Sequence, residues 1–493
     1  MSRVPAMKAS HLNAARRRRE LDGLTHTRLD VLVVGGGVTG CGIALDAASR
    51  GLTVALVEKD DLAFGTSRWS SKLVHGGLRY LATGDVAIAR ESAQERGVLM
   101  TRTAPHLVRA LPMVVPLSRD VSRKDGVLFD AGHRAADVLR RACGTPRSVL
   151  PRPRRLGVAE TTRLLPGVRR EGLRGGLLNW DGHLEDDARL VVAIARTAAL
   201  HGARILTRVR YGDGVLTDQL TGESLAYQAN TVVNATGAWA DTITPGTRLR
   251  PSKGVHVVLD ATVLGNPTAS ITVPVPGERN RYVFALPHAD GIVHVGLTDD
   301  ALDGPLPEVP RAEEHEIAFL LDTLSRGLEV PLTREDVVGS FAGVRPLVAG
   351  AEGRTADLSR RHSVTLEDGL LTVLGGKLTT YRRMAQDAVD LLTDVPCRTA
   401  DLPLVGAGAT GSDRLSRRYG DEAAEVAQAG PLTPVAEGVP VLQAELHWGL
   451  RAEGALDAQD LLERRTRLSL VDAWAEAAAP VVRSAVESWH AQA

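Results

Sequence analysis

The sequence predicts a fold that combines an α/β part with an α+β part, and three observations support it. Residues 29–58 show a strand, a glycine-rich turn, a helix and a second strand. Residues 248–348 mostly alternate apolar and polar side chains between Gly, Pro and Asp, which is typical of antiparallel strands. Beyond Pro396 the chain is charged, alanine-rich and helical in pattern. We therefore expect a Rossmann-like parallel sheet with helices, an inserted, mostly antiparallel sheet and a C-terminal helical domain.

Composition and charge exclude several classes of protein for this chain of 493 residues. Lys plus Arg and Asp plus Glu both number 59, so net charge offers no general attraction for nucleic acid, and we expect none as a partner. The cysteines, Cys41, Cys143 and Cys397, are scattered, which argues against a disulfide framework or a zinc site and favours a reducing, cytoplasmic location. We expect neither a metal site nor a membrane-spanning helix.

Residues 1–28 are expected to form a disordered, basic tail. The arginines at 16–19 suggest a twin-arginine export signal, but Glu20 and Asp22 follow where such a signal requires an apolar segment. Contact between these arginines and an anionic membrane stays an alternative.

The first structured unit, residues 29–58, carries a dinucleotide-binding motif. Its glycines are Gly35, Gly37 and Gly40, at the G-x-G-x-x-G spacing. The first permits a tight turn, the second lets the backbone approach a pyrophosphate, and the third lets helix and strand pack closely. Glu58 ends the second strand 18 residues beyond Gly40, where a carboxylate that accepts hydrogen bonds from a ribose is expected. A glycine-rich turn without a ligand is the alternative.

The next segment, residues 63–80, is rich in Ser, Thr and Gly. We expect a loop whose backbone and hydroxyl donors are available to a ligand. It ends with a glycine pair close to Arg79 and Tyr80. A solvated connector is the alternative, but such a connector does not require an arginine beside a glycine pair.

Three elements follow in residues 85–141. The pattern predicts a helix at 85–103 and a strand at 111–117 that prolines interrupt. Residues 126–141 form an amphipathic, basic segment. Such a segment can lie on anionic lipid, and an ordinary surface helix is an equal alternative.

A helix and two strands then return the chain to a nucleotide-type strand end. The pattern predicts a helix at 188–201, with Asp186 or Asp187 as its N-cap. Strands at 203–207 and 231–233 follow, and the second runs into Asn-Ala-Thr-Gly. The strands of the inserted sheet are predicted at 254–259, 281–286, 292–297 and 337–341.

A third strand–glycine–helix unit spans 370–392, with Thr379 or Thr380 as the helix cap. Three strand-end glycine sites are thereby spread along the chain. A single NAD site needs only the first, whereas FAD, which is long and carries a ring to be held at its far end, accounts for all three. The turn at 375–380 would direct a helix N-terminus at the flavin and stabilise the negative charge that develops there on reduction.

These motifs, with several others, resemble one known family. The matching stretches are VVGGGVTGCGIALDAASRGL, TSRWSSKLVHGGLRYL, EDDARLV, NATGAW, KGVH, GLTD, GVRPL, GGKLTTYR, QAEL and ERRTRL, in family order. The chain is therefore similar to the FAD-dependent, aerobic-type glycerol-3-phosphate dehydrogenases, a branch of the D-amino-acid-oxidase-like flavoproteins. It departs from the family at Cys41, where alanine is typical, and at Arg68 and Trp69, where small residues are usual.

The resemblance implies a domain plan and a set of FAD contacts. An FAD-dependent region would span 29–394, followed by a C-terminal helical domain at 395–493. Its FAD-binding parts would lie at about 29–80, 150–245 and 365–394, and its substrate-binding parts at about 81–149 and 246–364. The residues expected to contact FAD are Gly35, Gly37, Gly40, Glu58, Thr66, Ser67, Ser71, Lys72, Leu73, Ala235, Gly237, Gly376, Lys377, Leu378, Thr379 and Thr380.

The resemblance also implies glycerol 3-phosphate as substrate. A dianion needs several cations, and the expected substrate-binding residues are Arg79, Tyr80, Lys253, Arg281, Arg345, Lys377 and Arg382. Surface ion pairing is the alternative for each cation. Oxidation would pass a hydride from C2 to flavin N5 while a base removes the hydroxyl proton; His256 is the candidate base, with His75 a second histidine in a matching motif. His256, Arg345 and Lys377 form the expected catalytic set.

The family implies a quinone as electron acceptor, reached by peripheral contact with the inner face of the plasma membrane. An oxidase that uses oxygen and an amine or amino-acid oxidase of the same fold are the enzymatic alternatives. A flavin-binding scaffold without turnover is a non-enzymatic alternative, and a homodimer is open.

Overall fold

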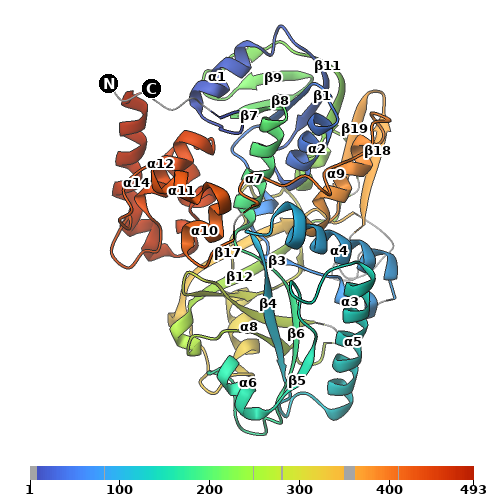
Figure 1. Ribbon diagram of the computed structural model, residues 1–493, viewed down its shortest axis with the longest axis vertical. Helices are drawn as coiled ribbons and strands as arrows, with labels where there is room; N and C mark the ends of the chain where they lie inside the picture. Colours follow the sequence, from blue (N-terminus) through green and yellow to red (C-terminus); the bar gives the residue numbers. More distant parts are fainter. Residues whose placement is uncertain are drawn as a thin grey trace.

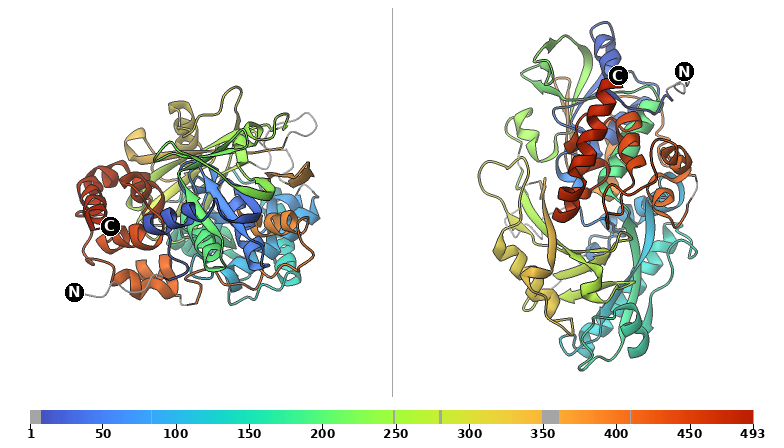
Figure 2. Two further views of the ribbon diagram at one scale, coloured as in Figure 1. Left: turned by 90° about the horizontal axis from the view of Figure 1, so that it is seen from above. Right: turned by 90° about the vertical axis from the view of Figure 1, so that its left-hand side faces the viewer.

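The computed structural model describes residues 8–82, 84–247, 249–278, 281–348, 361–408 and 410–492. A sheet with helices forms the upper part of the molecule in Figure 1, and a second sheet forms the lower part. The C-terminal helices, coloured red, lie beside the upper part. The right-hand view in Figure 2 shows the same division from the side.

The first sheet has six strands in the order β18-β19-β11-β1-β2-β7. Their bounds are β1 Arg28–Val34, β2 Val54–Glu58, β7 Arg204–Thr207, β11 Gln228–Asn234, β18 His362–Glu367 and β19 Leu370–Gly375. All neighbours run parallel except β18, which pairs antiparallel with β19. The carboxyl ends of β1, β11 and β19 therefore meet at one edge, which brings the three predicted glycine sites together.

Both faces of the first sheet are buried. Val31 and Val33 of β1 belong to a core shared with α2 Val38–Ser49, α7 Asp187–Leu200 and α9 Tyr381–Val389. The alternate residues Leu32 and Val34 belong to a second core shared with the small sheet of β8 Val209–Gly212, β9 Val215–Asp218 and β10 Ser224–Leu225. This division follows from the two-residue period of a strand.

The second sheet is built from two chain segments on either side of β7–β11 in the sequence. Its order is β16-β12-β15-β14-β13-β4-β6-β3, with β17 paired to β12 and β5 paired to β6. The bounds are β3 Leu73–Val74, β4 Val108–Pro116, β5 Arg154–Leu156, β6 Gly176–Leu184, β12 Ser252–Asp260, β13 Ser270–Pro274, β14 Tyr282–Pro287, β15 Ile292–Gly296, β16 Asp300–Ala301 and β17 Val337–Arg345. Only β13 and β4 pair in parallel among these described strands. A mostly antiparallel, inserted sheet is confirmed.

Strand β12 separates the core of the second sheet from the site. Val255, Val257 and Leu259 share a core with α8 Glu314–Ser325. The alternate residues Gly254 and His256 line the cavity described below. Because side chains alternate across a strand, burial of the first set fixes the direction of the second.

The remaining helices fall into two groups. Those near the second sheet are α3 Leu78–Ala82, α4 Val86–Val98, α5 Arg123–Ala142 and α6 Val158–Leu164. The C-terminal helices are α10 Arg414–Tyr419, α11 Ala423–Ala427, α12 Gln443–Ala452, α13 Ala458–Asp460 and α14 Asp472–Gln492, with a π-helical turn at Leu461–Arg465. Among the described residues, no helix combines the length and apolar character needed to cross a bilayer.

The expectation of a disordered tail at 1–28 is wrong for the part that the structure describes. Helix α1, Ala14–Asp22, begins at an Asn13 cap. Arg17 donates to the Thr207 carbonyl oxygen at 2.7 Å and to Asp218 at 2.6 Å. Leu12 forms a parallel bridge with Glu453. Arg17 was expected to contact solvent or lipid. It bonds instead to Thr207, on an edge strand of the first sheet, and to Asp218, because these acceptors, distant in the sequence, lie beside it.

Two local expectations fare differently. Asp186 caps α7 by accepting from the Ala188 and Arg189 amides, as predicted. Thr380 occupies the N-cap position of α9, but its side chain makes no capping bond and its hydroxyl donates to the Lys377 carbonyl oxygen at 3.3 Å. The start of the expected FAD-binding part, near 150–245, contains β5 and β6, which pair within the second sheet and not within the first.

Candidate active site

A cavity of about 2030 Å³ lies between the two sheets. The ends of β1, β2, β11 and β19 form one wall, and β4, β12, β14 and α5 contribute to the other. Ordinary ligand pockets measure roughly 300–1,000 Å³, so this cavity has room for a large cofactor together with a substrate.

The glycine turn after β1 gives the cavity a wall of backbone. Gly35 has a φ of +114°, a value that glycine adopts without strain. A Cβ atom at Gly40 would lie 1.9 Å from the Gly35 carbonyl oxygen, so helix and turn touch here as the motif predicts. Gly37 precedes α2 and lines the cavity. The N-terminus of α2 therefore faces the cavity, where its dipole favours a pyrophosphate.

Glu58 lines the same end of the cavity. Its carboxylate accepts from the Gly36 amide at 2.6 Å and the Asp60 amide at 2.9 Å. Burial outweighs these bonds and raises the pKa of Glu58 to about 7. A Cβ atom at Gly36 would lie 2.9 Å from the Glu58 side chain, so glycine is required for the carboxylate to reach this position.

Residues 59–73, here named the serine loop, join the two walls. Thr66, Ser67, Ser71 and Leu73 line the cavity. Ser67 Oγ accepts from the Val38 amide at 2.9 Å, Thr66 donates to the Val344 carbonyl oxygen at 2.6 Å, and Ser71 Oγ lies 2.8 Å from His256 Nε2. The loop thus touches the glycine turn, β17 and β12 at once.

Lys72 does not lie in the cavity wall, contrary to its expected contact with FAD. Its ammonium group is buried and donates to Asp187 at 2.8 Å and to the Arg68 and Ser70 carbonyl oxygens at 3.1 Å. Burial lowers the pKa of Lys72 to about 8, although Asp187 opposes the shift. These contacts stabilise the serine loop on the side that faces away from the cavity.

The two later glycine sites complete the cofactor wall. Residues that were expected to contact FAD line the cavity here: Ala235 and Gly237 after β11, and Gly376, Lys377, Leu378 and Thr379 after β19. Gly376 has a φ of +77°, and Gly237 one of +63°. Thr380 is buried outside the cavity wall.

Three predicted cations and Tyr80 line the cavity. Arg345 donates to Asp299 at 3.1 Å, to Ser252 at 3.2 Å and to the Thr298 carbonyl oxygen at 3.1 Å. Lys377 donates to Ser92 at 2.6 Å and lies 4.1 Å from the centre of the Tyr80 ring. Arg281 pairs with Glu278 at 2.8 Å. Three of the predicted positive charges therefore border one cavity.

Two other predicted cations lie elsewhere. Lys253 points away from the cavity and pairs with Glu313 at 2.8 Å and Glu316 at 3.0 Å. Arg382 is buried against Glu95, with bonds of 2.5 and 2.7 Å. Their expected contact with substrate is therefore not supported, because neither residue lines the cavity and both pair with carboxylates outside it. The side chain of Arg79 lies outside the described part of the structure.

His256 is positioned by contacts on two sides. Its ring stacks on Phe341 with centroids 4.7 Å apart and planes at 10°, and its Nε2 atom bonds to Ser71. Burial, followed by the nearby charges of Lys72 and Arg345, lowers the pKa of His256 well below 6.5. A neutral imidazole that lines the cavity can accept a proton at neutral pH.

The cavity also contains an acid that the sequence did not single out. Asp181 accepts from Arg96 at 2.6 Å and from the Gly76 amide at 3.0 Å, and lies 3.3 Å from His75. Burial opposes ionisation, but Arg96 and His75 outweigh it and lower the pKa of Asp181 to about 2. The Trp-Asp-Gly-His run was visible, yet its partners lie about 80 to 105 residues away.

Taken together, a glycine turn, an acid after the second strand and two further glycine turns around one large cavity fit FAD, and they define an FAD-dependent oxidoreductase. A family described as FAD dependent oxidoreductase matches residues 30–382, and the C-terminal domain of alpha-glycerophosphate oxidase matches residues 372–490. The chain belongs to the FAD-dependent glycerol-3-phosphate dehydrogenase family, and FAD is its cofactor.

Known proteins similar to the chain agree with this assignment. Glycerol-3-phosphate dehydrogenase 1 of Mycobacterium tuberculosis is 53% identical, with 93% of this chain and 95% of the relative covered. The crystal structure of glycerol-3-phosphate dehydrogenase from Bacillus halodurans, complexed with FAD, is 28% identical, covers 96% of this chain and 94% of that chain, and has a TM-score of 0.73. The L-alpha-glycerophosphate oxidase of Mycoplasma pneumoniae, with FAD bound, shares the fold at 18% identity over 77% of this chain and 99% of that chain, with a TM-score of 0.57.

Proposed function

We propose that this chain oxidises sn-glycerol 3-phosphate to dihydroxyacetone phosphate. The observation that carries the proposal is the combination of Arg345, Lys377 and a neutral His256 in the wall of one cavity. The 53% identity to a glycerol-3-phosphate dehydrogenase supports this choice of substrate. FAD, when bound, supplies the N5 atom that accepts the hydride from C2.

The side chains of the cavity supply binding and proton transfer. Arg345 and Lys377 would hold the phosphate, and Arg281 adds a third positive charge to the wall of the same cavity. His256 would take the C2 hydroxyl proton, with its ring orientation fixed by Ser71 and Phe341. The Lys377 turn precedes α9 and would stabilise negative charge on the reduced cofactor.

For the electron acceptor we propose a quinone at the inner face of the plasma membrane, with the protein otherwise cytoplasmic. Leu128 and Phe129 of α5 add apolar side chains to the cavity wall. On the same helix Val127, Leu128 and Val138 are exposed by 62, 71 and 63%, among basic residues. Exposed apolar and basic side chains on one helix fit peripheral contact with anionic lipid.

Anaerobic addition of glycerol 3-phosphate to the purified yellow protein tests the substrate. The flavin absorbance should bleach, and replacement of Arg345 by Ala should lower kcat/KM about 10²- to 10³-fold because a charged hydrogen-bonding group is lost from the anion site. Arg334, an exposed residue paired with Glu314, provides the control: Arg334→Ala should behave as the wild type.

The outcomes discriminate between the alternatives. Bleaching by glycine, sarcosine or a D-amino acid but not by glycerol 3-phosphate would identify an amine oxidase instead. Reoxidation of the bleached protein by a quinone analogue faster than by oxygen supports a dehydrogenase, whereas rapid peroxide formation supports the oxidase alternative.

A further inference from the structure

The side of the serine loop that faces away from the cavity is held by the C-terminal helices. Arg68 is fully buried, its guanidinium group pairs with Glu463, and its cation lies 5.1 Å from the centre of the Phe64 ring and 4.3 Å from that of the Trp69 ring. Phe64 and Trp69 both line the cavity. A residue of the loop thus links the cavity wall to a segment about 400 residues further along the chain.

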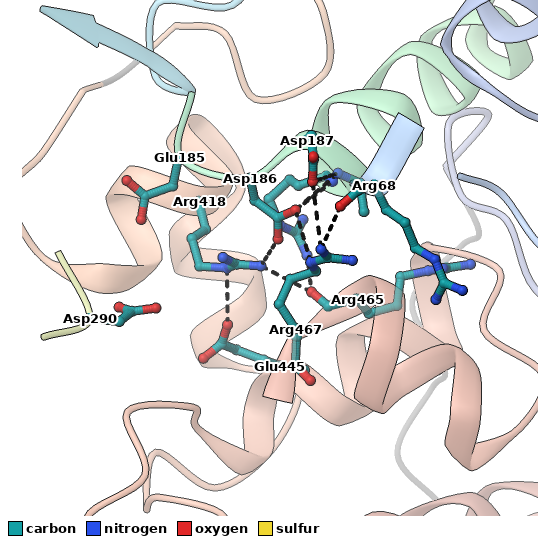
Figure 3. A network of polar contacts seen from close by, with 12 residues as sticks. Arg68, Glu185, Asp186, Asp187, Asp290, Arg418, Glu445, Arg465 and Arg467 are labelled. Carbon is teal, nitrogen blue, oxygen red and sulfur yellow. Dashed lines mark hydrogen bonds and ion pairs between the residues drawn. The ribbon is translucent and has the colours of Figure 1, made fainter. Parts of the chain in front are cut away.

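Arg467, from the same C-terminal segment as Glu463, also bonds to the serine loop. Its guanidinium group donates to the Arg68 carbonyl oxygen at 2.6 Å and to the Glu463 carbonyl oxygen at 2.7 Å, and it lies 3.8 Å from Asp186 and from Asp187 (Figure 3). Asp187 in turn accepts from the amide and hydroxyl of Ser70 at 2.9 and 2.8 Å. Ser70 lines the cavity, so two consecutive polar contacts connect Arg467 to the cavity wall.

The start of the serine loop is fixed by the same C-terminal segment. Asp61 accepts from Arg464 Nε at 2.6 Å and from the two terminal nitrogens of Arg465 at 2.7 and 2.8 Å. All three side chains are buried to at least 99%. The Ala63 amide then donates to the Gly36 carbonyl oxygen at 2.9 Å, so this anchor continues into the glycine turn.

A series of stacked side chains extends the connection to the candidate base. The Arg467 cation lies 5.2 Å from the centre of the Trp69 ring. Trp69 stacks on Phe341 at 5.7 Å and 22°, and Phe341 stacks on His256 at 4.7 Å and 10°. Leu470 and Val471 pack against Phe341 in one apolar cluster. The segment after Arg467 therefore also supports these stacked rings.

We propose that residues 463–467 are a positioning element for the active site, with Arg467 as its central residue. Through the serine loop they fix the flavin-facing hydroxyls, and through Trp69 and Phe341 they fix the ring of His256. The C-terminal helices are then part of the apparatus that sets the distance between flavin, substrate and base. This positioning role requires bound FAD. The rate of anaerobic bleaching that tests it also requires the proposed oxidation of glycerol 3-phosphate.

At this contact, two residues that depart from the family meet a stretch that matches it. Arg68 and Trp69 occupy positions where small residues are expected by resemblance, and ERRTRL at 463–468 is the motif that meets them. The π-helical turn at Leu461–Arg465 and the left-handed Arg467, with a φ of +64°, bring three arginines to one side of the segment. Strained or irregular backbone of this kind is found where a structure must aim particular side chains.

The test compares Arg467→Ala with a matched control in the holoprotein. Arg196 makes an equally buried ion pair, with Glu422 at 2.6 Å, between α7 and the C-terminal helices, but it does not touch the serine loop. Both variants should lower the melting temperature. Only Arg467→Ala should speed FAD release on dilution and slow anaerobic bleaching at saturating substrate, each about tenfold, and change the visible circular dichroism of the flavin.

Two further variants keep the test decisive. Arg467→Lys retains a cation beside Asp186 and Asp187 and should recover most of the wild-type readouts. If Arg467→Ala does not fold, Glu463→Gln provides a milder variant, because Glu463 is partly exposed and the substitution removes only the negative charge that pairs with Arg68. It should give the same change in dichroism and FAD release. Unchanged flavin readouts, or equal changes in Arg196→Ala, would overturn the proposal. If glycerol 3-phosphate does not bleach the wild type, the proposed substrate fails while dichroism and FAD release still decide this inference.

Discussion

Burial sets the protonation state of His256 and with it the pH range in which the proposed base can work. The pKa of His256 lies well below 6.5, so the imidazole is neutral, and able to accept a proton, at neutral and mildly acid pH. The rate constant of anaerobic flavin reduction should therefore stay constant as the pH falls from about 8 to 6.5 and decrease only below that range. Stopped-flow bleaching over this pH range checks the prediction.

Replacement of His256 by Gln should lower that rate constant about 10²- to 10⁴-fold, since general base catalysis is lost, and should abolish its acidic decline. His315 on α8 is exposed and provides the control, because His315→Gln should leave the profile unchanged. A wild-type inflection at pH 6.5 or above would show that a group other than His256 is the base.

Single residues explain where sequence reasoning succeeded and where it could not. Gly35, Glu58 and Arg345, which were expected to contact FAD or substrate, line the cavity because their motifs carry local geometric demands. Lys253 and Arg382 stood in equally specific motifs. Their partners, Glu313 and Glu95, lie about 60 and 290 residues away, so nothing near them in the sequence revealed that their charges are neutralised.

At the scale of an element, the N-terminal helix α1 fastens the first sheet. Arg17 lies on its buried side and Arg18 on its exposed side, although both belong to the same run of arginines. Arg17→Ala should reduce the free energy of unfolding by about 1–3 kcal/mol because charged hydrogen bonds to Asp218 and a carbonyl oxygen are lost. Arg18→Ala should change it by less than about 0.5 kcal/mol. Urea unfolding of both variants tests this, and equal stability would mean that the segment is not anchored.

Elements whose signals are local were predicted well. The cap of α7 by Asp186 and the strand–glycine–helix units depend on neighbouring residues, and the structure contains them. Strand β6 was not predicted, because its pairing with β4, about 70 residues earlier, has no local signature. The disordered tail was inferred from composition, which does not reveal acceptors such as Asp218.

At the scale of the whole molecule, buried ion pairs join the C-terminal helices to the FAD-binding part. Burial alone would raise the pKa of Asp61, but Arg465 and Arg464 outweigh it and hold the pKa well below 3.8. Asp61→Asn should destabilise the protein by about 3–5 kcal/mol at pH 7, because two buried arginines lose their partner. Thermal unfolding of both proteins measures the difference.

The pairing of Asp61 with Arg464 and Arg465 also predicts how the stability difference between the wild type and Asp61→Asn depends on pH. The folded carboxylate is ionised more readily than the unfolded one, so its contribution is complete above the unfolded pKa of 3.8 and is lost as the pH falls from 3.8 toward the lower folded value. The gap between wild type and Asp61→Asn should therefore narrow below pH 3.8. A gap that is constant down to pH 2 would contradict the assigned pairing.

The strand order of the first sheet has a consequence for biosynthesis. β1 leaves the ribosome early, but its neighbour β11 gains its second parallel partner only when β19 has been made, about 340 residues after β1. At translation speeds of about 5–20 residues per second, the nascent chain carries an incomplete nucleotide site for tens of seconds. Cofactor capture thus belongs to the end of synthesis, and an apolar sheet edge must be protected until then.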